Sequence, residues 1–234
     1  MTAYGQFCPV AKAMELLDER WTLLVVRELL MGSRHFNELR RGVPRMSPAL
    51  LSKRLRTLTQ AGVIERREDG GRAAYALTPA GAELRPAVEA LGRWGARWIP
   101  ELGDADLDPH LLMWDMHRGL DLAAMPDERT VLHFHFPGTR REVARWWLVI
   151  NQGQVDVCDD DPAQPVTVTI QASLRTLTDV WRGELNWAAA ASQGLRVEGP
   201  RWACRALPGW LRLSAFAAVP RPQRDQRAVG SITD

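Results

Sequence analysis

Residues 47–84 read SPALLSKRLRTLTQAGVIERREDGGRAAYALTPAGAEL, and this stretch decides the fold of the first half of the chain. Ser47 is a good helix N-cap, Pro48 suits the first helical position, and leucines recur at helical spacing until a glycine ends the helix. Val63–Arg67 and Arg72–Leu77 then predict two strands joined by a tight Asp-Gly-Gly turn. A helix followed directly by a basic hairpin predicts a winged helix.

The predicted helix has an apolar face and a cationic face. Leu51, Leu55 and Leu58 form the face that we expect to be buried, whereas small, polar and basic residues cover the opposite face, as insertion into a major groove requires. A solvated amphipathic helix is the alternative, but packing gives no reason for so many arginines at the hairpin tip. The residues expected at the DNA interface are Arg45, Ser47, Ala49, Ser52, Lys53, Arg54, Arg56, Arg66, Arg67 and Arg72.

The two halves of the chain differ in charge. The whole chain of 234 residues is +2, but residues 1–103 hold 16 Lys and Arg against 11 Asp and Glu, a net +5, and the rest hold 14 against 17, a net −3. We therefore expect two domains, of which the basic one faces nucleic acid. No apolar run is long enough for a bilayer, and three cysteines without framework spacing suit a reducing compartment, so we expect a cytoplasmic protein without a membrane partner.

Apolar periodicity predicts the helices on either side of the predicted recognition helix and wing. We expect a helix after Cys8-Pro9, a buried core helix over Trp21–Leu30, a short helix over Arg34–Leu39 and a turn over Arg40–Arg45. Residues 79–99 predict one long helix, whose apolar stripe is too wide for one small domain to cover. That stripe consists of Leu84, Val88, Leu91, Trp94 and Trp98. A second copy of the chain is the cover that we favour, and packing on its own domain is the alternative.

The first half resembles the HxlR-type winged-helix regulators, a branch near the MarR group. The residues that carry the resemblance, over about residues 5–100, include Cys8-Pro9, Arg20-Trp21, Arg27-Glu28-Leu29, Phe36-Asn37-Glu38-Leu39, Gly62-Val63 and Tyr75-Ala76-Leu77-Thr78. The resemblance implies a homodimeric bacterial transcription factor whose first and last helices form the dimer. It also implies double-stranded DNA with a palindromic operator as the partner, with repression the commoner mode.

The second half alternates strand and helix patterns after a linker at Asp104–Pro109. Strands are predicted over Arg129–Phe136, Arg145–Asn151, Gln154–Cys158, Pro165–Gln171 and Leu195–Val197. Helices are predicted over His110–Met125, Ser173–Trp181, Trp187–Gln193 and Pro200–Trp210. The tail over Pro220–Asp234 is expected to be disordered.

This half resembles the sterol-carrier-protein-2-like (SCP2-like) fold over about residues 107–215. Leu177, Trp181, Gly183, Ala190, Gly194–Gly199 and Leu207 carry the resemblance. It implies an antiparallel sheet with helices over one face and an apolar tunnel between them for a small hydrophobic ligand. The expected protein is therefore α+β: a winged helix-turn-helix domain at 1–103, an SCP2-like α/β domain with an apolar cavity at 104–219, and a tail at 220–234.

Tryptophans give a separate reason to expect a pocket, because seven of the ten lie after residue 104 and wide aromatic rings line apolar pockets well. Ordinary core packing is the alternative for most of them. Neighbouring Trp146 and Trp147 must point to opposite faces of their strand. The residues expected to bind a ligand are Trp114, His133, His135, Trp147, Trp181 and Trp187.

Enzyme and cofactor signals are weak. There is no glycine-rich phosphate loop, no nucleophile elbow and no metal-ligand run. His133 and His135 share a strand face, but the sequence supplies no third metal ligand. Asp159–Pro162 lacks the pattern of a calcium loop. We therefore expect no enzyme and no cofactor.

Cys8 offers an alternative mode of sensing. It lies at a helix N-terminus, where the helix dipole favours a thiolate, and some HxlR-type members sense oxidants or electrophiles at this position. The alternative function is therefore a redox-sensing or electrophile-sensing regulator whose C-terminal domain is only structural. An inert thiol near the dimer contact is the simpler interpretation.

Overall fold

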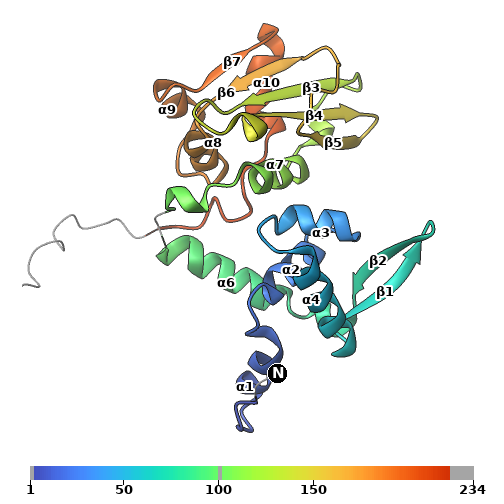
Figure 1. The fold of residues 1–234 in the computed structure, drawn as a ribbon. Coiled ribbons are helices and arrows are strands. Elements are labelled where there is room, and N and C mark those ends of the chain that lie inside the picture. The colour runs from blue at the N-terminus through green and yellow to red at the C-terminus, as the bar shows by residue number, and fades with distance from the viewer. Residues whose placement is uncertain (1–2, 100–101, 222–234) are drawn as a thin grey trace, which may run out of the picture.

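The structure, a computed structural model, describes residues 3–99 and 102–221. Two separate hydrophobic cores form, one around Leu51 in the N-terminal half and one around Phe134 in the C-terminal half. Figure 1 shows the two halves one above the other. Most of the tail expected to be disordered, residues 222–234, lies outside the described residues.

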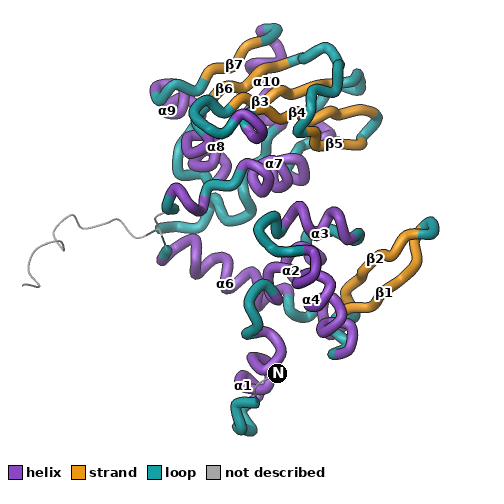
Figure 2. Tube along the Cα trace, in the orientation of Figure 1, coloured by secondary structure: helices purple, strands orange, loops and turns teal. Residues whose placement is uncertain are grey.

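The N-terminal half is helical apart from one hairpin. Its helices are α1 Pro9–Leu17, α2 Thr22–Leu30, α3 Phe36–Gly42, α4 Pro48–Gln60, α5 Pro79–Ala82 and α6 Arg85–Trp98, and its strands are β1 Ile64–Asp69 and β2 Arg72–Leu77. In Figure 2 the hairpin projects beside α4, and the other strands gather in the C-terminal half. This is the winged helix that the sequence predicted.

Local chemistry explains where α4 and the wing begin and end. The Ser47 hydroxyl accepts a hydrogen bond from the Leu50 amide at 3.3 Å, which caps α4 as predicted. Gly62 follows the helix with a φ of +71°, a conformation that favours glycine. At the wing tip Asp69 pairs with Arg72 across two glycines with positive φ, so the predicted tight turn is present.

Two predicted helix boundaries in this half were wrong. Helix α3 continues to Gly42, well into the expected turn. Gly42 packs on the carboxylate of Glu28, and an added Cβ there would lie 1.9 Å from the Glu28 side chain. The helix expected over residues 79–99 is broken between α5 and α6. Pro86 explains the break, because proline has no N–H to donate to the carbonyl four residues earlier and its ring clashes with that carbonyl.

The C-terminal half is a five-stranded sheet with helices. Its strands are β3 Thr130–His135, β4 Arg145–Asn151, β5 Gln154–Cys158, β6 Val168–Gln171 and β7 Arg196–Glu198, in the order β5-β4-β3-β6-β7. Its helices are α7 Pro109–Arg118, α8 Leu174–Trp181, α9 Trp187–Ser192 and α10 Arg201–Trp210, with short 3₁₀ turns η1 Asp104–Asp106, η2 Leu122–Ala124 and η3 Arg141–Val143.

The sheet is mixed rather than antiparallel. β3 pairs antiparallel with β4 but parallel with β6. The β4–β5 hairpin occupies one side of β3, so the chain must cross to the other side and enters β6 in the direction of β3. The expectation of a wholly antiparallel sheet was therefore wrong.

The two faces of the sheet have different environments. Phe134 and Trp146 belong to the core shared with the helices, together with Met113 and Leu177, whereas Trp147 points to the other face. These core side chains pack between the sheet and the helices, where the resemblance implied an apolar tunnel.

Helix α7 is shorter than predicted. It ends at Arg118, and Gly119 follows as the C-cap. An added Cβ at Gly119 would lie 3.0 Å from the Trp181 ring, so glycine lets α8 approach closely. Leu120 then pairs with Leu211 in an isolated bridge instead of continuing the helix to Met125.

Candidate DNA interface and its junction with the C-terminal half

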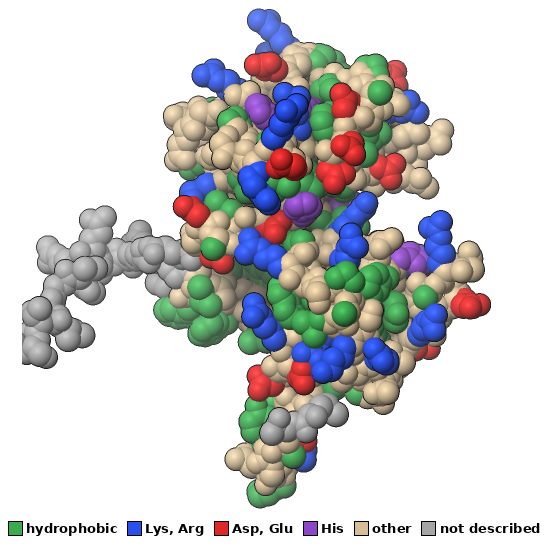
Figure 3. All heavy atoms as spheres, in the orientation of Figure 1, with side chains coloured by type: hydrophobic (Ala, Val, Ile, Leu, Met, Phe, Trp, Pro, Cys, Tyr) green, Lys and Arg blue, Asp and Glu red, His purple; other side chains and the backbone are tan. Residues whose placement is uncertain are grey.

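Helix α4 presents the face that the sequence predicted for DNA. Leu51, Leu55 and Leu58 are at most 1% exposed, and their burial fixes which way the helix faces. The exposed residues include Ser47, Ala49, Ser52, Lys53, Arg56 and Gln60. Figure 3 shows Lys and Arg side chains gathered on the face of the N-terminal half where α4 lies. This combination of small, polar and basic side chains is typical of a recognition helix.

Arg54 does not belong to that face. Its side chain is buried, its Nε donates to the carbonyl oxygen of Arg20 at 3.1 Å, and its guanidinium pairs with Glu19. Position 54 lies between the buried Leu51 and Leu55, so the residue falls on the inner side of the helix. Arg54 is therefore not one of the DNA contacts that the sequence predicted. Its side chain instead connects α4 to the segment before α2.

The three wing arginines are exposed, but they divide between two faces. Arg67 and Arg72 share one face of the hairpin, because Arg72 pairs with Asp69 and strand residues alternate. Arg66 points to the opposite face, and Arg67 also pairs with Glu65. A DNA duplex that lies against one face of the hairpin can therefore contact Arg67 and Arg72 together. It cannot contact Arg66 from the same face.

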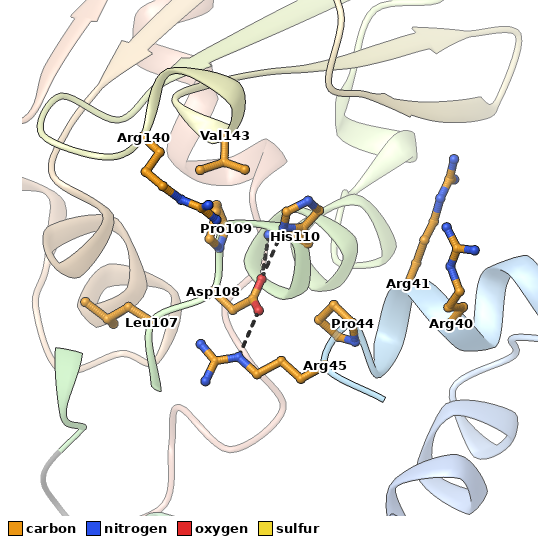
Figure 4. A pocket seen from close by; sticks show the side chains of 10 residues that line it. All are labelled: Arg40, Arg41, Pro44, Arg45, Leu107, Asp108, Pro109, His110, Arg140 and Val143. Carbon is orange, nitrogen blue, oxygen red and sulfur yellow. Dashed lines mark hydrogen bonds and ion pairs between the residues drawn. The ribbon is translucent and has the colours of Figure 1, made fainter. Parts of the chain in front are cut away.

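Arg45 is directed to the C-terminal half. Its Nε lies 3.3 Å from a carboxylate oxygen of Asp108, which also caps α7 (Figure 4). Its side chain therefore belongs to the junction between the halves as well as to the basic surface before α4.

Helix α6 carries an uncovered apolar surface. Leu84 and Val88 pack against the N-terminal core as expected, but Leu91, Trp94 and Trp98 are 55%, 58% and 56% exposed. Helix α1 has no buried residue. Phe7, just before α1, is 99% exposed, and Val10, within α1, is 69% exposed. Large exposed apolar patches of this kind mark interaction surfaces.

A buried carboxylate joins the two halves. The Glu28 side chain in α2 is fully buried. It accepts hydrogen bonds from the guanidiniums of Arg27 at 2.7 Å and Arg118 at 2.9 Å, and from the indole Nε1 of Trp114 at 3.2 Å. Two of these three partners lie in α7, so the carboxylate fastens the C-terminal half to the winged helix.

The electrostatics of this junction shift three pKa values. Burial raises the pKa of Glu28, but Arg27 and Arg118 outweigh burial and hold it below its ordinary value. Burial also raises the pKa of Asp115, and Arg118 only partly offsets this effect. Burial lowers the pKa of His117 to about 4, so its imidazole is neutral at pH 7.

The C-terminal segment makes a second connection between the halves. Phe216 packs on Gly92 of α6 so closely that an added Cβ at Gly92 would lie 2.2 Å from the ring. The Arg221 Nε donates to the carbonyl oxygen of Ala96 at 2.9 Å, and its guanidinium pairs with Glu184 at 2.6 Å. The first residues of the expected tail are thus held against the helix that carries the apolar stripe.

The predicted ligand-binding residues fall into three places. Trp114 lies at the junction, as described above. Trp181 and Trp187 pack against the C-terminal core. His133 and Trp147 stack with ring centroids 4.9 Å apart on the sheet face that points away from the helices. The six predicted residues therefore do not line one tunnel.

The third place borders a surface hollow of about 590 Å³. Its lining includes His135, Arg145, Trp147 and Asp159–Asp161. Burial lowers the pKa of His133 beside it, with help from Arg145 and His135. Across residues 3–99 and 102–221, no three His, Cys, Asp or Glu side chains are grouped to hold a metal ion. In the same ranges, no helix combines the length and apolarity needed to cross a membrane.

A recognition helix followed by a two-stranded wing that carries three exposed arginines defines a winged helix-turn-helix protein. The family model described as HxlR-like helix-turn-helix matches residues 16–102. The Bacillus subtilis HTH-type transcriptional regulator YvaP is 37% identical over 99 residues, which is 41% of this chain and 92% of YvaP. The chain therefore belongs to the HxlR-like helix-turn-helix family.

Other relatives show how far the similarity extends. An uncharacterized HTH-type transcriptional regulator of Mycobacterium tuberculosis is 43% identical over 96 residues, 39% of this chain, and the chain spans only 59% of that relative. Reduced YodB from B. subtilis has a TM-score of 0.36 at 29% identity, covering 42% of this chain and all of YodB. The redox regulator HypR in its oxidized form has a TM-score of 0.36 at 28% identity, covering 38% of this chain and 94% of HypR.

Sequence reasoning missed the ion pair of the junction, Glu28 with Arg118. Glu28 carried a usable signal, because it is a carboxylate that follows Arg27 inside the mostly apolar segment TLLVVRELL. Buried carboxylates need cationic partners, so this position required an arginine from somewhere in the fold. No sequence pattern pointed to Arg118, which lies 90 residues away.

Proposed function

We propose that the protein is a homodimeric, sequence-specific DNA-binding transcriptional regulator, acting as a repressor. The exposed face of α4, with Lys53 and Arg56 beside small residues, is the observation that carries the proposal, and membership of the HxlR-like family supports it. In this arrangement α4 lies in the major groove, while Arg67 and Arg72 of the wing reach the flanking phosphates.

We propose that two copies of the chain meet through α6 and α1. The exposed apolar residues Leu91, Trp94 and Trp98 support this, since a second copy would remove them from water. A twofold dimer presents two α4 helices to two half-sites about one helical turn apart, so the operator is expected to be palindromic.

The C-terminal half is proposed as the domain that modulates DNA binding. We divide the chain into a reading domain at 1–103 and an SCP2-like domain at 104–219, whose ligand is a small hydrophobic molecule. The junction at Glu28 and the Phe216 contact with α6 support the coupling, because they connect the C-terminal half to both the reading core and the proposed dimer helix.

Sensing through Cys8 is the second candidate. Cys8 is a half-buried free thiol that immediately precedes α1, so its oxidation would alter the proposed dimer contact. Diamide treatment would abolish operator binding by the wild type, but not by Cys8→Ser, if this candidate is right. Unchanged operator binding by the wild type would dismiss it.

Selection of bound duplexes from a random DNA pool tests the main proposal. The selected sequences should share a twofold-symmetric site, and sedimentation should give two chains per duplex. Binding to the selected duplex should weaken steeply as salt increases, because phosphate contacts release counterions. Failure to enrich any sequence, with only uniform weak binding, would contradict sequence-specific reading by this chain.

A further inference from the structure

A hollow of about 470 Å³ lies between the winged helix and the C-terminal half (Figure 4). Arg40, Arg41 and Arg45 line it from the α3 side, and His110 and Arg140 line it from the other half. An adjoining hollow of about 270 Å³ shares Arg40, Arg41 and His110 and reaches Trp114 and Trp146. The volume of the main hollow is within the range of small-molecule sites.

The charges around the main hollow are unbalanced. Asp108 neutralises Arg45 at 3.3 Å and lies 3.4 Å from His110. Arg40, Arg41 and Arg140 form no ion pair with any residue that the structure describes. Like charges in a partly enclosed space raise the local potential and attract anions. Asp159, at the rim of the adjoining hollow, is the other carboxylate in the two linings.

The positions of these arginines separate them from the DNA-facing side of α4. In Figure 4 the Arg40 and Arg41 side chains extend from α3 toward the C-terminal half, and Arg140 approaches from that half on the opposite side. Arg41 is also held over the Trp114 ring at 5.4 Å, at the buried junction. A hollow flanked by guanidiniums on both sides suits a ligand with anionic groups at both ends, since guanidinium binds carboxylate and phosphate well.

We propose that this hollow binds a small organic polyanion, with at least two carboxylate or phosphate groups, and that its binding changes DNA affinity. The regulatory part rests on the proposed function. The ligand bridges α3 and the C-terminal half, and only the turn 43–46 separates α3 from Ser47, the cap of the reading helix. A ligand that fixes α3 against the C-terminal half therefore shifts the position of α4 whenever it binds the two arrangements unequally.

Titration calorimetry of the full chain without DNA tests the site. Citrate and inorganic pyrophosphate serve as the probes, at ionic strength held constant with sodium chloride. The expected result is saturable binding of one anion per chain by at least one probe. Arg140→Gln and Arg41→Gln should each weaken that binding about tenfold or more, because each removes a charge-assisted contact. Arg205→Gln, at an exposed arginine of α10 outside the hollow, is the matched control and should leave binding unchanged.

The regulatory part is tested by repeating operator titrations with and without the probe that binds. The probe should change operator affinity of the wild type and of Arg205→Gln, but not of Arg140→Gln. Citrate binding without pyrophosphate binding would assign the ligand to polycarboxylates, and the reverse to phosphorylated compounds.

Three results would overturn the proposal: neither probe binds saturably, binding is indifferent to both hollow variants, or operator affinity of the wild type does not respond to the bound probe. If Arg41→Gln weakens DNA binding in the absence of probe and Arg140→Gln affects nothing, the α3 arginines contact DNA phosphates and the site is refuted. If anion binding follows the expected variant pattern but no operator is found, the proposed function fails and the anion site stands.

Discussion

The carboxylate of Glu28 in α2 and the guanidinium of Arg118 in α7 lie 2.9 Å apart, and this pair connects two halves that otherwise have separate cores. Glu28 is fully buried, so its charge depends on Arg27, Arg118 and Trp114 for compensation. Removal of Arg118 leaves this buried charge compensated by the guanidinium of Arg27 alone, which is costlier than the loss of a surface pair.

Arg118→Met should therefore lower the free energy of unfolding by about 3 kcal/mol. Urea denaturation followed by tryptophan fluorescence measures this loss. The double variant Glu28→Gln/Arg118→Met should lose less free energy of unfolding than the sum of the two single variants. In the double variant both members of the pair are neutral, so neither leaves the other as a buried charge without its partner. Arg129→Gln is the control, since Arg129 is exposed and donates to the neutral side chain of Gln164. A cost for Arg118→Met no larger than that of the control would refute the role of the junction.

Acid should weaken the fold before the carboxylates titrate. The pKa of His117 is about 4 in the folded chain against 6.5 ordinarily, so the unfolded state takes up the proton first as pH falls. The contribution of His117 to the free energy of unfolding is complete above about pH 6.5 and declines toward pH 4. The loss from this residue is at most about 3 kcal/mol, and partial solvation of the imidazole makes it smaller. His133, whose pKa burial also lowers, acts in the same direction.

His117→Gln should flatten the unfolding free energy between pH 6.5 and 4 relative to the wild type, and His133→Gln measures the second contribution separately. Glu28 acts in a different window: its pKa is lowered, so its stabilisation is lost only as pH falls below its ordinary value of 4.5. An unchanged pH slope in His117→Gln would show that its imidazole is not buried in the neutral form.

Sequence reasoning reached the winged helix because its signals are local. Ser47, Gly62 and the glycines of the wing tip each act within a few residues, and the structure has them in the expected roles. Pro86 was also visible in the sequence, but the apolar stripe on either side of it favoured one continuous helix. An apolar stripe predicts which face of a helical segment is buried. It does not predict whether the segment forms one unbroken helix.

The parts that were missed depend on distant contacts. Arg54 looked like its basic neighbours, and only the carbonyl of Arg20, 34 residues earlier, shows that it points inward. The parallel pairing of β3 with β6 depends on where the chain crosses after β5, which strand periodicity does not encode. The hollow at the junction combines arginines of both halves, so no single segment of the sequence could reveal it.

Lys53 and Arg54, adjacent in sequence, should behave differently on substitution. Lys53→Ala should reduce the salt dependence of DNA binding by about one phosphate contact per chain, with little effect on stability. Arg54→Ala should instead lower stability by about 1–3 kcal/mol, because it leaves the Arg20 carbonyl and Glu19 without their partner. Salt titrations of DNA affinity and thermal unfolding separate the two effects. A reversed pattern would mean that α4 is rotated from the orientation described.

Trp94→Glu should convert the protein to a monomer. Trp94 is 58% exposed in the apolar stripe of α6, and a carboxylate in the centre of a paired apolar surface is costly. Arg93→Gln, at the neighbouring exposed position paired with Glu89, is the control and should remain dimeric. Sedimentation velocity measures both. A wild-type protein that sediments as a monomer at micromolar concentration would rule out the dimer proposed here.

The most direct measurement of the central claim compares specific and nonspecific DNA affinity for Arg56→Ala and Arg67→Ala. Arg56 lies on the exposed face of α4 and Arg67 on the wing. Arg56→Ala should cost about 1–3 kcal/mol on the selected duplex and far less on random duplex, whereas Arg67→Ala should weaken both alike. Equal losses on both duplexes for Arg56→Ala would contradict the assignment of α4 as the helix that reads the operator.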